Sequence, residues 1–136
     1  YPAILIGAGN LGRAVASHMS FESRGFRLMG IFDSNPALKN QYIRGVKIQS
    51  MENLEQFCIE KQIKVAILCL PKDSVEFLAD TLIEKANVRC FWNFSHYDIS
   101  LRHEGVIAEN VHMSDSLMTL CYRIQDFEEK AEPSSV

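Results

Sequence analysis

Three glycines at a fixed spacing form the run of residues best suited to chemistry, Gly7-Ala8-Gly9-Asn10-Leu11-Gly12. An apolar segment, 3–6, leads into this run, and apolar residues at helical spacing follow from Leu11. In that context the first glycine permits a tight turn, the second lets the backbone approach a pyrophosphate, and the third allows close packing of helix on sheet. The N–H groups that open the helix supply an anion site. The run therefore predicts a dinucleotide-binding loop.

An acidic residue stands at the distance from these glycines at which such sites bind ribose. Asp33 ends the next apolar segment, 26–32, and comes 21 residues after Gly12. A carboxylate there accepts hydrogen bonds from the adenosine ribose hydroxyls and repels a 2′-phosphate, which favours NAD(H) over NADP(H). The alternative is that Asp33 only forms a turn with Ser34 and Asn35.

Two further apolar segments end in residues expected at the same edge of the sheet, Leu70-Pro71 and Asn93-Phe94-Ser95. Ligands of open α/β sheets lie outside the carboxyl ends of the strands, so we expect both groups to border the nicotinamide half of the cofactor. Phe94 could contact the ring, and Asn93 could shape the loop or bond the carboxamide. A strand-ending proline and a buried phenylalanine are equally ordinary structural features.

The histidines and cysteines do not have metal-binding spacings, and no metal site is predicted. His18 is expected on the first helix near the cofactor crevice, whereas three others lie in or beside loops: His96, His103 and His112. The cysteines fall singly within apolar patterns, and we expect buried, reduced thiols at Cys58, Cys69, Cys90 and Cys121.

Strands and helices alternate along the chain. Strands are expected over 3–6, 26–32, 46–48, 65–70, 89–94 and 106–109, and helices from Leu11 and over 51–61, 71–86 and 114–128. This alternation predicts an α/β fold, a Rossmann-type doubly wound parallel sheet in a single domain. The dinucleotide-binding and dimerisation domain is expected to span 1–128, followed by a flexible C-terminal tail over 129–136.

Composition limits the function classes. The 136 residues carry a net charge of -3 without a basic cluster, which argues against nucleic-acid binding by this chain itself. No apolar stretch reaches the roughly 20 residues that span a bilayer, and no signal peptide is recognisable, so a soluble cytoplasmic protein is expected. The chain begins at Tyr1-Pro2, without Met and directly before a strand, as a piece of a longer protein would.

The ordered set of motifs resembles the Rex redox-sensing transcriptional repressors. The resemblance rests on the glycine run with Arg13-Ala14, and on Gly30-Ile31-Phe32-Asp33, Pro71-Lys72, Trp92-Asn93-Phe94 and the segment from Glu109 to Leu117. It implies a homodimer whose N-terminal winged helix binds operator DNA and whose C-terminal Rossmann domain binds NADH or NAD+, with NADH releasing the DNA. It also implies that this chain is the sensor half alone, without enzymatic activity. The chain departs from the family at three places, with His18 for a frequent Tyr, His96 for a frequent Pro, and Cys69-Leu70 for Thr-Val.

The C-terminal helix has more apolar residues than one buried stripe requires: Leu117, Met118, Leu120, Cys121, Tyr122, Ile124 and Phe127. We therefore expect this helix to be exchanged between the subunits of a two-fold dimer, in agreement with the resemblance. The exchange would bring His112 and Met113 toward the partner's nicotinamide pocket, close to the partner's His18. The alternative is a helix buried within its own subunit.

Two other functions remain open. An NAD-dependent oxidoreductase needs a general acid or base, and the chain has no Tyr-x-x-x-Lys pair, although His18 or His96 could act. A coenzyme A or other nucleotide-binding Rossmann module is disfavoured by Asp33, which suits a free ribose better than a phosphorylated one.

Overall fold

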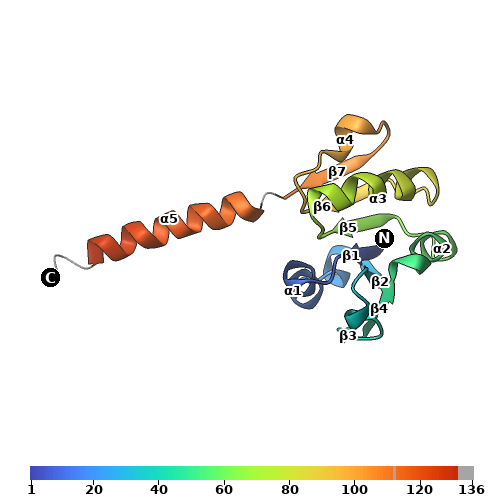
Figure 1. Cartoon of the computed structure of the whole chain (residues 1–136), viewed down its shortest axis with the longest axis horizontal. Coiled ribbons are helices and arrows are strands. Elements are labelled where there is room, and N and C mark those ends of the chain that lie inside the picture. The colour runs from blue at the N-terminus through green and yellow to red at the C-terminus, as the bar shows by residue number, and fades with distance from the viewer. Residues whose placement is uncertain (112, 132–136) are drawn as a thin grey trace.

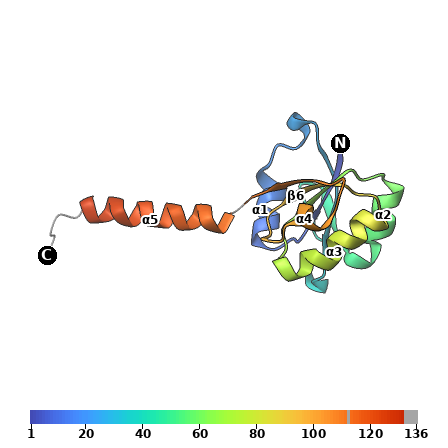
Figure 2. The ribbon, with the colours of Figure 1, turned by 90° about the horizontal axis from the view of Figure 1, so that it is seen from above.

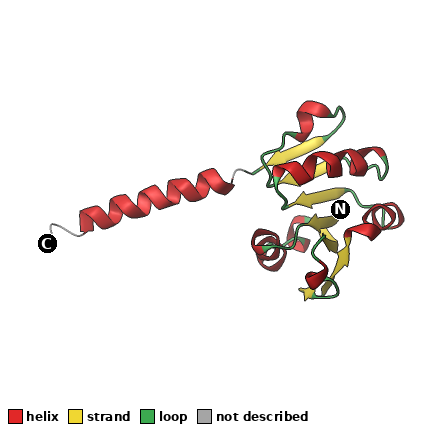
Figure 3. Ribbon diagram, viewed as in Figure 1, coloured by secondary structure: helices red, strands yellow, loops and turns green. Residues whose placement is uncertain are grey.

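The computed structural model describes residues 1–111 and 113–131, which fold around one mostly parallel sheet (Figure 3). Its strands are β1 (Pro2–Ile6), β2 (Arg27–Asp33), β3 (Tyr42–Ile43), β4 (Val46–Ser50), β5 (Val65–Leu68), β6 (Cys90–Asn93) and β7 (Ile107–Asn110). They are ordered β3-β4-β2-β1-β5-β6-β7, and every neighbouring pair is parallel except β3 with β4. The fold class predicted from the sequence is confirmed.

Apart from α5, the helices divide between the two faces of this sheet. They are α1 (Asn10–His18), α2 (Leu54–Glu60), α3 (Lys72–Glu84), α4 (Ile99–Arg102) and α5 (Met113–Ala131), with single 3-10 turns at η1 (Glu22–Arg24), η2 (Pro36–Leu38) and η3 (Met51–Asn53). On one face α1 packs against Leu5, Ile31 and Ile67. On the other face α2, α3 and α4 contribute to the core with Ile4 and Phe32. The central strand β1 is apolar throughout because helices cover the sheet on both sides.

Four elements differ from the expectation. The short strand β3 and the single turn of α4 have too few residues for a period to be recognised. The helix expected over 51–61 begins as η3, where the Ser50 hydroxyl caps the Glu52 N–H at 3.3 Å. The C-terminal helix continues to Ala131, so 129–131 are helical, and an Asp126–Lys130 ion pair of 2.9 Å supports this last turn. The remainder of the expected tail lies outside the described residues.

Helix α5 extends away from the sheet in both views of the ribbon (Figures 1 and 2). Three of its apolar residues, Leu120, Ile124 and Phe127, are exposed. Within the described residues, no helix is both long enough and apolar enough to cross a membrane.

Candidate functional site

The glycine loop lies where the order of the strands reverses. After β1 the chain proceeds through β2 to β4 on one side, and it then crosses to β5 on the other side of β1. Crevices at the carboxyl ends of strands on either side of such a reversal are the usual ligand sites of doubly wound sheets. The loop from Gly7 to Gly12 opens into this crevice beside the residues that follow β5.

Two of the three motif glycines are required by the fold itself. Gly7 has a φ of +99°, and a Cβ there would collide with the Cys69 carbonyl and approach the Leu70 side chain to 3.0 Å. A Cβ on Gly12 would collide with the Gly7 carbonyl. These close approaches hold α1 against the end of β1, and they bring the loop against Leu70.

Gly9 differs from both, because the protein leaves its surroundings empty. A Cβ at Gly9 would have no heavy atom within 4 Å, and its φ of -72° is open to any residue. Gly9 is the N-cap of α1, without a side-chain cap and without an acidic residue in the first turn. The first-turn N–H groups have no intrahelical partners, so the site can accept an anion that approaches the backbone.

Asp33 lies against this loop. Its Oδ2 accepts a hydrogen bond from the Ala8 N–H at 2.6 Å, and its Oδ1 accepts one from the Asn35 N–H at 2.7 Å. The second bond is the turn anticipated as an alternative role, and the first places the carboxylate beside the glycines. Each carboxylate oxygen can accept a second hydrogen bond, so neither contact precludes a ribose hydroxyl.

The strands β5 and β6 deliver the other expected residues to the same edge. Leu70 is half-buried beside Gly7, and Pro71 is exposed at the N-cap of α3. The Phe94 N–H donates to the Leu68 carbonyl at 3.0 Å, which keeps the two strand ends together. The half-buried Phe94 ring lies 4.8 Å from the Trp92 ring, centroid to centroid.

Asn93 has its hydrogen-bonding capacity used within the protein. Its Nδ2 donates to the Tyr97 carbonyl at 2.6 Å and to Asn110 Oδ1 at 3.0 Å. Its Oδ1 accepts from the Ser95 N–H at 3.0 Å and from the Ser95 hydroxyl at 2.6 Å. Both donors and both lone pairs are therefore occupied, and of the two roles anticipated for Asn93 this geometry supports shaping the loop.

The sequence did not indicate two members of this network, Tyr97 and Asn110. Asn110 is the last residue of β7 and pairs in register with Asn93. The available signal in the sequence was a polar residue directly after the strand expected over 106–109. Tyr97 acts through its backbone carbonyl, which no side-chain pattern reveals.

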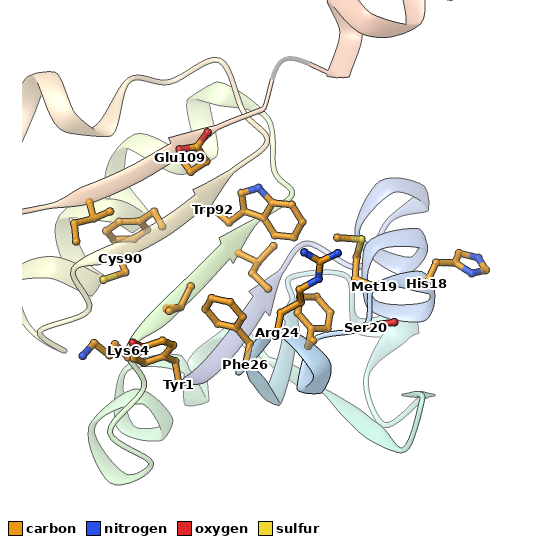
Figure 4. A pocket seen from close by; sticks show the side chains of 15 residues that line it. Tyr1, His18, Met19, Ser20, Arg24, Phe26, Lys64, Cys90, Trp92 and Glu109 are labelled. Carbon is orange, nitrogen blue, oxygen red and sulfur yellow. The ribbon is translucent and has the colours of Figure 1, made fainter.

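His18 lies away from the glycine loop. It is the last residue of α1, about 12 Å along the helix axis from Asn10, because α1 runs back from the carboxyl edge. It is exposed, and Figure 4 shows its imidazole turned outward. Met113 is the first residue of α5, and His112 lies outside the described residues.

The thiols are less uniformly buried than expected. Cys58 is buried, whereas Cys69 and Cys90 are half-buried at the end and the start of strands. Burial raises the pKa of the Cys58 thiol to about 12, and it does the same for Cys69. The side chain of Cys121 lies outside the described residues. Among residues 1–111 and 113–131, no three His, Cys, Asp or Glu side chains gather where a metal could bind.

An apolar groove of about 920 Å³ opens beside the end of α1, over the part of the sheet formed by β5, β6 and β7 (Figure 4). Its floor includes Ile67 and Trp92, and its amino end is formed by Tyr1 and Phe26. No helix of the described chain covers this area, because α2, α3 and α4 belong to the opposite face. An exposed apolar surface of this kind commonly marks an interaction site.

The strand order and the glycine loop at the reversal define a Rossmann-type nucleotide-binding class of domain. Comparison with known proteins agrees, since the family model described as "CoA binding domain" matches residues 1–97. A Vibrio fischeri UDP-D-quinovosamine 4-dehydrogenase structure aligns at 18% identity with a TM-score of 0.53, covering 65% of this chain and 73% of that one, which reflects the shared fold alone.

The similarity to one group is much greater. The redox-sensing transcriptional repressor Rex of Caldanaerobacter subterraneus subsp. tengcongensis is 48% identical over 128 residues, covering 94% of this chain and 56% of that protein. Rex of Clostridium tetani is 40% identical, covering 95% and 60%. Crystal structures of RSP, a Rex-family repressor, with β-NADH and with β-NAD+ and operator DNA both align with a TM-score of 0.80, at 45% and 43% identity. They cover 97% and 100% of this chain, and 63% of each matched chain.

This chain belongs to the CoA-binding domain family, and over nearly its whole length it is similar to one part of the Rex redox-sensing transcriptional repressors. It spans 56% to 60% of the lengths of the curated relatives described above.

Proposed function

We propose that this chain is the NAD(H)-sensing domain of a Rex-type redox-responsive repressor. The observation that supports this most directly is Gly9, a glycine that the fold does not require and that leaves its backbone open beside the Asp33 carboxylate. A pyrophosphate would bind the first-turn amides of α1, and Asp33 would accept the adenosine ribose hydroxyls. The relatives solved with β-NADH and with β-NAD+ support the same ligand.

The remaining cofactor contacts follow from the edge of the sheet. The loop residues Ala8, Asn10 and Leu11 would surround the pyrophosphate together with Gly7, Gly9 and Gly12. Leu70 and Pro71 would border the nicotinamide half, with Phe94 against the ring. Asn93 and Ser95 would keep this border in shape through their mutual hydrogen bonds. The similarity to transcriptional repressors supports a domain that would bind the cofactor without turning it over.

The dimer would form by exchange of α5. This helix presents uncovered apolar residues, and the groove beside α1 is an apolar surface without a covering helix. In an isologous dimer, each α5 would lie in the partner's groove, so that the apolar residues of the helix and the apolar surface of the groove would cover each other. The segment with His112 and Met113 would then lie near the partner's nicotinamide pocket and connect ligand state to the angle between subunits. Residues 1–131 would thus form the cofactor-binding and dimerisation unit.

Deletion of α5 tests this assembly. A chain that ends before Ser114 should be monomeric or aggregated in sedimentation and should bind NADH more weakly, whereas removal of 132–136 alone should change neither property. A chain without α5 that stayed dimeric and bound NADH normally would rule out the exchange.

The regulatory output would require a DNA-binding winged helix outside this chain. NADH would favour one dimer arrangement and so release operator DNA, and NAD+ would favour the other. A cytoplasmic location follows from this function.

Coenzyme A binding is the second candidate, because the matching family model is that of a CoA-binding domain. Coenzyme A carries a phosphate on its adenosine ribose, which the Asp33 carboxylate would repel. Parallel titrations with coenzyme A and with NADH distinguish these two functions.

A further inference from the structure

We propose that two charged residues on α5 and two on the walls of the groove fix the direction and register in which α5 of a second copy docks. This inference rests on the proposed exchange of α5. It identifies the side chains that would determine how α5 pairs with the groove of the second copy. The evidence is the position of each charge relative to the apolar surfaces.

Three exposed apolar residues of α5 form a narrow stripe on one side of the helix. Leu120, Ile124 and Phe127 are 51%, 46% and 72% exposed. Their spacing of four and three residues puts them on the same side of the helix. This stripe is the face that can enter an apolar groove.

Charges of opposite sign flank the stripe. With 100° between consecutive residues, Glu128 lies about 80° to one side of Leu120 and Arg123 about 60° to the other. Both side chains are exposed, and neither has an ion-pair partner among the described residues. The two are five residues apart, or roughly 7.5 Å along the axis.

The groove has charges of opposite sign on its two walls. Glu109 lies on β7, and Arg24 lies in η1 between α1 and β2 (Figure 4). Within the described chain neither has an ion-pair partner. Glu109 is near the carboxyl end of its strand, whereas Arg24 precedes the start of β2, so the two are offset along the strand direction.

The handedness of the fold selects one docking direction. Seen from the α1 face with the strands pointing upward, the right-handed β1-α1-β2 crossover puts η1 on the right and β7 on the left. A right-handed helix that descends against the strands, with its stripe on the sheet, presents Glu128 to the right and Arg123 to the left. Glu128 then faces Arg24, and Arg123 faces Glu109.

The offset along the strands allows the charges to meet in either direction, and only their signs distinguish the two directions. In the descending helix Arg123 lies nearer the carboxyl edge than Glu128, as Glu109 lies nearer that edge than Arg24. The reversed helix would place Arg123 opposite Arg24 and Glu128 opposite Glu109. Like charges at an interface disfavour the wrong arrangement and opposite charges favour the right one.

Charge reversal in the full chain tests the proposed register. Arg24→Glu and Glu128→Arg should each raise the dimer dissociation constant about tenfold at low salt, because each contact occurs twice in a two-fold dimer. The double reversal should restore the constant to within about threefold of the original. Glu129→Arg, about 180° from Leu120, is the matched control and should have little effect.

The readouts are sedimentation equilibrium at low and high salt, circular dichroism to verify folding, and NADH titration. A double variant as weak as the two single changes combined would overturn the register. Phe127→Asp distinguishes this failure from failure of the exchange, since it should dissociate the dimer under either register. A dimer that survives Phe127→Asp would overturn the exchange and, with it, this inference.

Discussion

Substitution of Gly9 by valine separates the needs of the fold from those of the ligand. No protein atom lies within 4 Å of the position that a Cβ would occupy, and the φ of -72° suits valine. The cost to the fold is the poorer N-cap, about 1 kcal/mol. In a domain of this size that cost lowers the melting temperature by roughly 4 °C.

The cost to the ligand is much larger, because the empty space at Gly9 is where the pyrophosphate would approach the backbone. Displacing it would break two or more hydrogen bonds between amides and a charged group, each worth about 1.5–3 kcal/mol. The expected loss is therefore about 3–6 kcal/mol, or two to four orders of magnitude in the dissociation constant.

Isothermal titration with NADH measures this loss directly, and thermal unfolding measures the change in stability. Gly25→Ala is the control, since Gly25 has open surroundings but a φ of +87° and lies away from the loop. That variant should be destabilised and should retain its affinity for NADH. If Gly9→Val bound NADH as tightly as the original chain, the placement of the pyrophosphate would be wrong.

Three further outcomes are expected. Asp33→Ala should narrow the preference for NADH over NADPH, measured by parallel titrations, and an original chain that binds both equally would contradict the assigned role. The buried thiols should not affect the free energy of unfolding below pH 9, and above pH 9 they should lower it, because the raised pKa of Cys58 and Cys69 keeps these thiols protonated in the folded state while they ionise in the unfolded state. Urea unfolding at pH 8 and at pH 10 measures this change. Equal midpoints at the two pH values would refute the prediction. The chain alone should neither shift duplex DNA in a gel at physiological salt nor consume NADH with small carbonyl substrates, and steady consumption lost in Gly9→Val would instead favour an enzyme.

Much of the fold was predictable because its signals are local. The strands β1 and β5 are short apolar runs, and α1 and α3 have a clear helical period. The glycine loop and Asp33 were also predictable, because the turn, the helix start and the strand end have fixed spacings.

The rest of the site depends on contacts between distant segments. The hydrogen bond from Asn93 to Asn110 requires the register of β6 against β7, and no local pattern determines that register. The distance of His18 from the loop follows from the direction and length of α1. The groove is formed by strands and a connection far apart in the sequence, and it exists because the described helices leave that area uncovered.

Titration of the full chain with NADH and with coenzyme A under identical conditions tests the central claim most directly. The account predicts that NADH binds, that Gly9→Val abolishes this binding, and that coenzyme A in large excess does not displace NADH. Tighter binding of coenzyme A than of NADH would contradict the assignment of the site to NAD(H).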